Sequence, residues 1–470
     1  MRKIVRYFFQ LLCFITCASQ AKAQDTAVIT AMRDTSAILI SSVNITGNKR
    51  TKNFIIQREI QFKAGDTIRR DVLAKNLLQA RTQVHNTNLF IEVKIDSTVL
   101  PDSSLQVNVT VKEKWYIYPT PQFQLADRSL NEWLKIHNGD LNRVIYGIKF
   151  AHYNFTGRRD QLKLYLLNGY ARNFSMSYNN PSVNAALTKG ISIATGFTQN
   201  REIAYKINYF NRILFFRKPG FVRNSFISSV GYSLRKGFFK STGVGINLYS
   251  INVNDSVIDS KYNPYYFNSN KRSQFFPEIT FGVGYRNTDN NNYPLKGISY
   301  GYGFSKRGTG FTGGINATTL SGSVSKFITH RKNWYSTVQA SALIKVPFNQ
   351  AFINLSGIGL RGLELYAVSG VANSTLKYTL SKKIAAFRIP IPFKIKSVPN
   401  IPFKIFAKTY TDAGYSYTPA QFTTQFNNRL LYTGGFGLDI LTLYDIVLKV
   451  EYSFNQLGEK GLFLQGKGGF

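Results

Sequence analysis

Alternation between apolar and polar residues runs through most of this chain and constrains its fold more than any other feature. In the clearest stretch, residues 446–454, one face would carry Ile446, Leu448, Val450, Tyr452 and Phe454, and the other Val447, Lys449, Glu451 and Ser453. Similar stretches recur through residues 115–470, separated by clusters of Gly, Asn, Asp and Lys, without a long helical pattern. A period of two residues predicts β-strands whose two faces differ in polarity.

The polar faces of these predicted strands favour a membrane barrel over a soluble sandwich. They carry Lys, Glu, Arg and Gly, which suit a wet lumen better than the packed interface between two sheets. Phe and Tyr recur near the strand ends, as in the aromatic girdles of membrane barrels. At roughly 20–24 residues per strand and loop, the region predicts about 16 antiparallel strands, within a range of about 14–18.

Residues 1–23 have the pattern of a secretory signal peptide. Arg2, Lys3 and Arg6 precede a short apolar core, and Ala-Lys-Ala at residues 21–23 forms a cleavage site. Both cysteines, Cys13 and Cys17, lie in this segment, so the exported chain is expected to contain no disulfide and no cysteine metal ligand. Residues 24–37 are expected to be a linker, and no apolar stretch after residue 23 is long enough for a transmembrane helix.

Residues 38–114 predict a small α+β domain ahead of the barrel. A strand at Ala37–Thr46 is followed by expected helices over residues 51–62 and 69–86, and then by strands over residues 89–95 and 105–111. In the first helix, Phe54, Ile55 and Ile60 would share one face. The predicted order is therefore β-α-α-β-β.

Three short motifs in this domain resemble a POTRA domain. They are Gly47-Asn48 after the first strand, Gly65-Asp66 between the helices, and Asn88-Leu89-Phe90 at the start of the second strand. The resemblance implies that the second strand lies at a sheet edge, where an extended client segment can add by β-augmentation. The alternative is an edge covered by a neighbouring loop. The expected client-binding residues are Leu89, Phe90, Ile91, Glu92, Val93, Lys94 and Ile95.

Two motifs in the barrel region resemble the BamA/TamA superfamily of outer-membrane assembly proteins. Gly359-Leu360-Arg361-Gly362-Leu363 is similar to that superfamily's Val-Arg-Gly-aromatic loop motif, with leucine in place of the aromatic residue. Residues 406–414 are similar to a late-strand motif that ends in Asp-Ala-Gly, here Asp412 to Gly414, and alternation would put Lys408, Tyr410 and Asp412 on one polar face. The resemblance implies that the loop folds back into the barrel, where we expect Arg361 to pair with Asp412. The alternative is a solvated Arg361 and a hydrated Asp412.

The end of the sequence has two features of outer-membrane barrels. The terminal Phe470 resembles the C-terminal signal by which such barrels are recognised for insertion. Glycine is frequent in the last predicted strand, and glycine weakens strands. These glycines are Gly461, Gly466, Gly468 and Gly469. They are compatible with a weakly paired seam between the first and last strands, or with tight turns.

Catalytic and metal-binding patterns are missing from the sequence. The four histidines, His85, His137, His152 and His330, lie far apart and lack metal-ligand spacing. We find neither a G-x-S-x-G motif nor a P-loop. We therefore expect a protein that is not an enzyme and binds neither a cofactor nor a metal.

The resemblance implies a mainly β outer-membrane protein, with one periplasmic POTRA domain and a barrel over residues 115–470, that inserts or translocates other polypeptides. Expected partners are unfolded or nascent outer-membrane polypeptides, accessory assembly proteins, and outer-membrane lipid or lipopolysaccharide. The net charge of +35 would suggest nucleic acid, but export argues against that partner, and lipid phosphates attract the same cations. Alternatives are a secretion pore for one partner protein and a passive or structural barrel.

Overall fold

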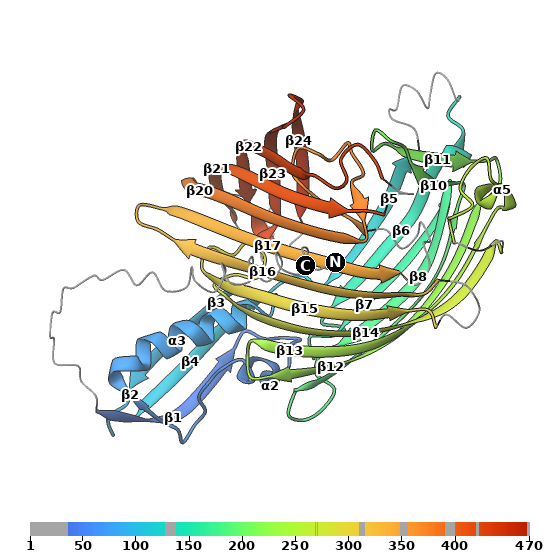
Figure 1. Cartoon of the computed structure of the whole chain (residues 1–470). Helices are drawn as coiled ribbons and strands as arrows, with labels where there is room; N and C mark the ends of the chain where they lie inside the picture. Colours follow the sequence, from blue (N-terminus) through green and yellow to red (C-terminus); the bar gives the residue numbers. More distant parts are fainter. Residues whose placement is uncertain are drawn as a thin grey trace.

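The chain folds into a small N-terminal domain and a large curved sheet, which together confirm the predicted mainly β fold (Figure 1). The computed structural model describes residues 36–126, 138–267, 269, 271–309, 315–347, 356–390, 400–419 and 423–467. The large sheet contains sixteen strands, as the sequence predicts, and curves into a barrel. We call the end of the barrel that contacts the N-terminal domain the domain end, and the opposite end the far end.

The N-terminal domain is a four-stranded sheet in the order β2-β1-β4-β3, packed against two helices. Strands β1 and β4 are parallel, whereas β1–β2 and β3–β4 are antiparallel. Its core is apolar and almost fully buried, with Ile40, Ile56 and Val107 inaccessible to solvent. The elements are β1 (Ala37–Thr46), α2 (Asn53–Gln57), β2 (Thr67–Arg69), α3 (Arg70–His85), β3 (Phe90–Val99) and β4 (Leu105–Glu113).

The first helix of this domain is shorter than the sequence predicts. Helix α2 has five residues, because the amides of Glu59 and Ile60 bond carbonyls three residues back and tighten the chain into a turn. Phe54 does not share the buried side of Ile55 and Ile60: its side chain is 40% exposed, and the guanidinium of Arg158 in the barrel lies 5.3 Å from its ring centroid. The short strand β2, which follows the turn at Gly65, was not predicted.

The strands of the large sheet are antiparallel to their neighbours and follow chain order around the barrel, with small hairpins inserted at the far end. They are β5 (Ile117–Leu125), β6 (Val144–Tyr153), β7 (Gln161–Gly169), β8 (Ala171–Asn180), β9 (Lys189–Asn200), β12 (Arg223–Lys236), β13 (Lys240–Val253), β14 (Ser273–Thr288), β15 (Gly297–Arg307), β16 (Ala317–Thr329), β17 (Trp334–Pro347), β20 (Ala372–Pro390), β21 (Asn400–Tyr417), β22 (Leu430–Leu441), β23 (Val447–Asn455) and β24 (Lys460–Lys467).

The two faces of the barrel wall differ in polarity as the alternation predicts. In β23, Leu448 and Phe454 point outward with 49% and 48% of their surface exposed, whereas Glu451 and Ser453 point inward and are 1% exposed. An apolar outer face of this kind, with a polar inner face, is typical of a barrel wall that contacts lipid. None of the described helices has the length and apolar character needed to cross a bilayer.

Short elements lie on the connections between the barrel strands. At the far end, the hairpin of β10 (Glu202–Ile207) and β11 (Ile213–Arg217) joins β9 to β12, and α5 (Asp255–Ile258) follows β13 (Figure 1). The connection from β17 to β20, also at the far end, contains the small ladder of β18 (Ser356–Gly357) and β19 (Ser369–Gly370). At the domain end, the 3-10 turn η5 (Leu443–Asp445) joins β22 to β23.

Candidate functional site: a folded-in loop, a lumen network and a free strand edge

The connection between β18 and β19 returns into the barrel and carries the predicted loop motif. Leu360 and Leu363 in this segment are 3% and 5% exposed, and they pack with Phe426 and Leu431 from later parts of the chain. A leucine therefore fills the position at which the related motif has an aromatic residue. Because these apolar contacts lie inside the wall, the loop occupies part of the lumen.

Arg361 at the tip of this loop forms an ion pair with Asp412 on the inner face of β21. Nε of Arg361 donates to Oδ2 of Asp412 at 3.0 Å, and Nη2 donates to Oδ1 at 2.5 Å. The backbone N–H of Arg361 also donates to Asp412 Oδ2, at 3.1 Å. The Asp412 side chain is fully buried and the Arg361 side chain is 17% exposed. Two parallel bonds of this kind match the fork of a guanidinium to a carboxylate.

Two further groups hold the guanidinium of Arg361 in place. Its carbon Cζ lies 3.8 Å from the ring centroid of Tyr410, which is the geometry of a cation–π contact. Its Nη1 donates to the hydroxyl of Thr379 on β20 at 3.0 Å. The guanidinium is therefore bonded to two neighbouring strands as well as stacked on a ring, and the loop tip is anchored to the lumen wall.

Two glycines make room for the loop at this site. A Cβ added to Gly414 of β21 would lie 3.0 and 3.1 Å from the two methyl carbons of Leu360. Gly362 has φ +83°, and a Cβ there would lie 2.9 Å from the Cβ of Ser453 on β23. Asn455 completes the contact by donating to the carbonyl of Gly362 at 2.9 Å. The small residues of both motifs thus permit close approach between loop and wall.

A second buried ionic group lies on the same part of the wall, closer to the domain end, and the sequence did not reveal it. Lys408 of β21 bonds Asp439 of β22 and lies 2.6 Å from Oε1 of Glu451 on β23. The side chains of all three residues are at most 7% exposed. Alternation placed Lys408 and Glu451 on polar faces, but only the register of three strands brings the three groups to one depth.

A turn from across the barrel reaches this ionic group. Tyr293, in the turn between β14 and β15, donates its hydroxyl to Oδ2 of Asp439 at 2.9 Å. Its ring packs against Phe406, whose side chain is inaccessible to solvent. Leu295 and Tyr335 also pack into this cluster. The turn at residues 289–296 therefore contacts the late strands at the domain end of the lumen.

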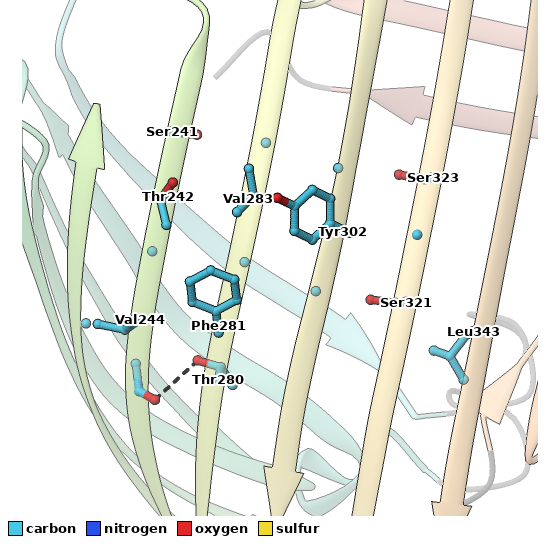
Figure 2. Close-up of a pocket in the computed structure, with 18 of the residues that line it drawn as sticks. Ser241, Thr242, Val244, Thr280, Phe281, Val283, Tyr302, Ser321, Ser323 and Leu343 are labelled. Carbon is cyan, nitrogen blue, oxygen red and sulfur yellow. Dashed lines mark hydrogen bonds between the residues drawn. The ribbon is translucent and has the colours of Figure 1, made fainter. Parts of the chain in front are cut away.

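The opposite wall of the lumen has a stretch that is lined mostly by small residues. It borders a cavity of about 1010 Å³ that extends along β12 to β17 (Figure 2). Figure 2 shows Ser241, Thr280, Ser321 and Ser323 on this wall, with many glycines between them. The folded-in loop borders the same cavity through Gly357, Ile358 and Gly359.

At the far end, the loops contact one another across the barrel. Asn211, at the turn of the β10–β11 hairpin, is fully buried and bonds both the Thr424 hydroxyl, at 2.7 Å, and the Phe426 amide, at 3.0 Å. Its carbonyl accepts the amide of Ala367 at 2.8 Å. The next residue, Arg212, stacks on the ring of Tyr366 at 4.3 Å. These contacts hold the hairpin against the loop that carries Arg361.

The predicted client-binding strand lies at one edge of the N-terminal sheet. Strand β3 pairs with β4 and has no second neighbour among the described strands of that sheet. Phe90 and Val93 of this strand are buried, whereas Glu92 and Lys94 are exposed. One backbone group has a partner on the helix, because Nε of Arg81 donates to the carbonyl of Val93 at 2.9 Å.

The N-terminal domain contacts three turns at the domain end of the barrel. The amide of Lys52 bonds the carbonyl of Gly157 at 3.0 Å, and Asn86 donates to the carbonyl of Thr288 at 2.9 Å. Glu59 pairs with Arg235 at the end of β12. These partners lie in or directly beside the connections β6–β7, β14–β15 and β12–β13, so the domain is fixed to the barrel at several points.

The sixteen-stranded sheet has two ends, β24 and β5. Each pairs with one neighbour, β23 and β6 respectively, and no ladder joins β24 to β5 among the described residues. The predicted insertion signal at Phe470, and the glycines at 468 and 469, lie outside the described residues. Within the described part of the chain, no group of three His, Cys, Asp or Glu side chains is placed to hold a metal ion.

Comparisons with known proteins support both parts of this architecture. The family model for POTRA, described as "Surface antigen variable number repeat", matches residues 38–114. A crystal structure of BamA from Haemophilus ducreyi lacking POTRA domains 1–3 is similar with a TM-score of 0.50 and 12% identity, over 92% of this chain and 84% of that chain. CdiB from Escherichia coli gives a TM-score of 0.49 and 10% identity, over 99% of this chain and 97% of that chain. No curated protein sequence matches.

The matched POTRA region coincides with the domain that has the free strand edge, and the similarity to BamA extends over the barrel. A sixteen-stranded barrel with an apolar outer wall behind a POTRA domain is the architecture of an outer-membrane β-barrel protein. The chain therefore combines a region that matches the POTRA family model with a barrel whose fold is similar to that of BamA.

Proposed function

We propose that this protein is a non-enzymatic outer-membrane factor that inserts or translocates other polypeptides, with the POTRA edge receiving the client and the barrel seam admitting it. The observation that carries the proposal is the pair of strands β5 and β24, which end the sixteen-stranded sheet without a ladder between them among the described residues. In hydrocarbon an unpaired edge is costly, because its N–H and C=O groups find no water. A client strand that pairs with such an edge removes this cost.

The POTRA domain supplies a first binding step for an extended segment. Strand β3 offers backbone groups along an edge, and its exposed stretch continues from Asp96 to Val99, beyond the expected residues 89–95. Pairing through the backbone is largely independent of side chains, so one edge can accept many client sequences. The hydrogen bond from Arg81 to the Val93 carbonyl would have to break where a client pairs at that position.

The folded-in loop favours sideways entry over passage along the axis. Arg361 anchors the loop to β20 and β21, and the loop narrows the lumen. Asn211 ties the same loop to the far-end hairpin. As long as these contacts persist, a client leaves the periplasm more readily through the seam than through the far end.

A second candidate function, a secretion pore for one partner protein, draws on the lumen itself. The cavity of about 1010 Å³ is lined along β12 to β17 largely by serine, threonine and glycine. A smooth wall of this kind would let an extended chain slide without strong binding. This function requires the Arg361 loop to move out of the lumen.

Disulfide cross-linking of the seam tests the proposal. Both native cysteines lie at positions 13 and 17, so cysteines introduced into the barrel can be paired selectively. One cysteine replaces Gln122 of β5, and the second replaces Gly461, Leu462, Phe463 or Leu464 of β24 in turn. The variants are expressed in cells depleted of the native protein, and the outer-membrane proteome is quantified with and without a reductant.

We expect a cross-linked seam to lower the abundance of the client proteins, and the reductant to restore it. The matched control is a disulfide between positions 452 and 462, which are already register partners in β23 and β24 and should remain active when cross-linked. A fully active cross-linked seam would refute lateral entry. Loss of one exported protein, with the membrane proteome unchanged, would instead support the secretion pore.

A further inference from the structure

An aromatic row marks the outer wall of the barrel towards its far end. Phe174, Phe197 and Phe226 lie opposite one another on the adjacent strands β8, β9 and β12. Each is between 37% and 46% exposed and points outward with the other apolar residues of the wall. Aromatic residues of a membrane barrel lie at the boundary between hydrocarbon and headgroups. The row therefore gives the depth of the outer-leaflet interface on this side of the barrel.

A polar row lies one step further out on the same face. Two residues along the strands from the phenylalanines, Arg172, Gln199 and Asn224 again lie opposite one another. They form a chain of hydrogen bonds, in which Nη1 of Arg172 donates to Gln199 at 3.1 Å and Gln199 donates to Asn224 at 2.9 Å. Nε of Arg172 donates to Asn168 of β7 at 2.8 Å. Two strand residues span about 7 Å, which is the depth of lipid headgroups.

Three arginines gather at this level on two aromatic rings. The guanidiniums of Arg172 and Arg201 lie 4.7 and 4.9 Å from the ring centroid of Phe221. That of Arg217 lies 5.3 Å from the ring centroid of Tyr170. Stacking fixes the guanidinium planes. Arg172 uses Nε and Nη1 for Asn168 and Gln199, and Arg201 uses Nη1 for the carbonyl of Pro219. Among the described residues, Nη2 of both arginines and the guanidinium of Arg217 have no hydrogen-bond partner, and these N–H groups remain to bind a ligand.

The charge of this group is not balanced by its neighbours. Glu202, the register partner of Arg217 across the β10–β11 hairpin, places one carboxylate beside three arginines, and it accepts a hydrogen bond from the hydroxyl of Tyr170 at 2.8 Å. None of the three arginines has a carboxylate within ion-pair distance among the residues that the structure describes. Nε of Arg201 is buried and likewise lacks a hydrogen-bond partner within that part of the chain. The site is therefore rich in positioned donors and poor in acceptors.

From this geometry we infer that Arg172, Arg201 and Arg217 form a binding site for the phosphate of an outer-leaflet lipid headgroup. A guanidinium offers paired N–H groups that match two phosphate oxygens. The exposed apolar wall below, with Phe174, Met176 and Phe197, lies where the acyl chains of the same lipid would run. A bound lipid would be held at its headgroup and along its chains, next to the root of the β10–β11 hairpin.

The test measures lipid binding by the full-length protein in detergent, by native mass spectrometry. The probes are lipid A with its phosphates and dephosphorylated lipid A, and inorganic phosphate serves as competitor. We expect the phosphorylated form to bind more tightly. The double variant Arg172→Gln/Arg201→Gln should bind phosphorylated lipid A about tenfold or more weakly, as expected for loss of charge-assisted hydrogen bonds.

Arg272→Gln is the matched control, because Arg272 lies at the same end but already pairs with Asp255 at 3.2 Å; its lipid binding should stay unchanged. Heat-modifiable migration on gels verifies that each variant is folded. If the double variant does not fold, Arg217→Gln, at an exposed position, provides the second test of lipid binding. Equal binding of both lipid forms, equal loss in Arg272→Gln, or displacement of the lipid by equimolar inorganic phosphate would each overturn the inference.

Discussion

Glu59 of the POTRA domain and Arg235 of barrel strand β12 form a two-point ion pair across the domain boundary. Nη1 and Nη2 of the arginine lie 2.5 and 2.7 Å from the two carboxylate oxygens. The Glu59 side chain is 5% exposed and that of Arg235 is 25% exposed. Nη2 also donates to the carbonyl of Phe238, in the turn after β12, at 3.1 Å. The pair therefore fixes one side of the POTRA domain to the β12–β13 turn.

We expect Glu59→Gln to loosen this attachment by about 2 kcal/mol, the lower end for loss of one partner of a hydrogen-bonded charge pair, because Arg235 is partly hydrated. The measurement is the distance between a spin label on the POTRA domain and one on the barrel, which should broaden. Charge reversal in Glu59→Arg/Arg235→Glu should narrow it again. In the control Arg69→Gln, which breaks the pair of an exposed arginine with Asp71 inside the POTRA domain, the distance should not change. An unchanged distribution in Glu59→Gln would contradict the prediction.

The sequence predicts the faces of the barrel strands well, since a period of two decides which side chains share a side. Lys408, Tyr410 and Asp412 were expected on one face, and all three are buried on the inside of the wall. The sixteen strands follow from the length of the region divided by the residues that one membrane strand needs. The resemblance to known motifs indicated which arginine and which aspartate to consider together.

The sequence does not predict which side chains of neighbouring strands lie at the same depth in the barrel, because alternation leaves the register between strands open. The contact of Lys408 with Asp439 and Glu451 depends on the register of β21, β22 and β23. The pairing of Glu59 with Arg235 depends on how the POTRA domain is placed against the barrel, which no local pattern encodes. The sequence overestimates the length of helix α2, because apolar residues continue at helical spacing into the turn that follows it.

Replacement of Arg361 by Lys or Ala should release the loop from the lumen wall. Lysine keeps the charge but cannot form the two-point contact with Asp412 or stack as a plane on Tyr410. Because the Asp412 side chain is fully buried, loss of its partner should cost roughly 3–5 kcal/mol in Arg361→Ala. Faster protease cleavage within residues 356–371 and a lower temperature of heat-modifiable migration measure the effect.

The control for the loop variants is Arg388→Ala, at an exposed position on β20, the strand that carries Thr379. It should leave both protease cleavage and heat-modifiability unchanged. Asp412→Asn should weaken the loop in the same direction as Arg361→Ala, and the double variant should cost less than the sum of both single changes, as expected for coupled partners. Additive effects would indicate that the two groups act independently.

Gly362→Ala should destabilise the folded-in loop by about 1–3 kcal/mol, because it combines an unfavourable backbone conformation with overpacking. Gly362 has φ +83°, and the new Cβ would lie 2.9 Å from the Cβ of Ser453. Gly458→Ala is a matched control, since that glycine has φ +78° but no neighbouring atom within 4 Å of the added carbon. The difference in thermal stability between the two variants measures the effect of the contact with Ser453 alone. Equal losses of thermal stability in both variants would show that the loop does not pack closely against β23.

Acidification should weaken the POTRA domain through His85, the last residue of α3. Burial lowers the pKa of His85 below its ordinary value of 6.5; Asp445 in the η5 turn raises it, and Lys114, Arg81 and Lys404 lower it further. The folded state therefore binds a proton less readily than the unfolded state. As the pH falls below about 6.5, the unfolded state takes up more protons and the free energy of unfolding decreases.

Thermal unfolding at pH 7.5 and pH 5.5 tests this, with His85→Gln as the variant that cannot be protonated. We expect the wild type to lose more stability between the two pH values than His85→Gln does, because acid still protonates other groups in both proteins. His330→Gln is the control, since His330 lies in the turn between β16 and β17 and bonds Ser336. It should keep the wild-type pH dependence. Equal pH dependence of the wild type and His85→Gln would exclude His85 as the source of the acid destabilisation. A spin label on the POTRA domain, measured at both pH values, separates loosening of that domain from unfolding of the barrel.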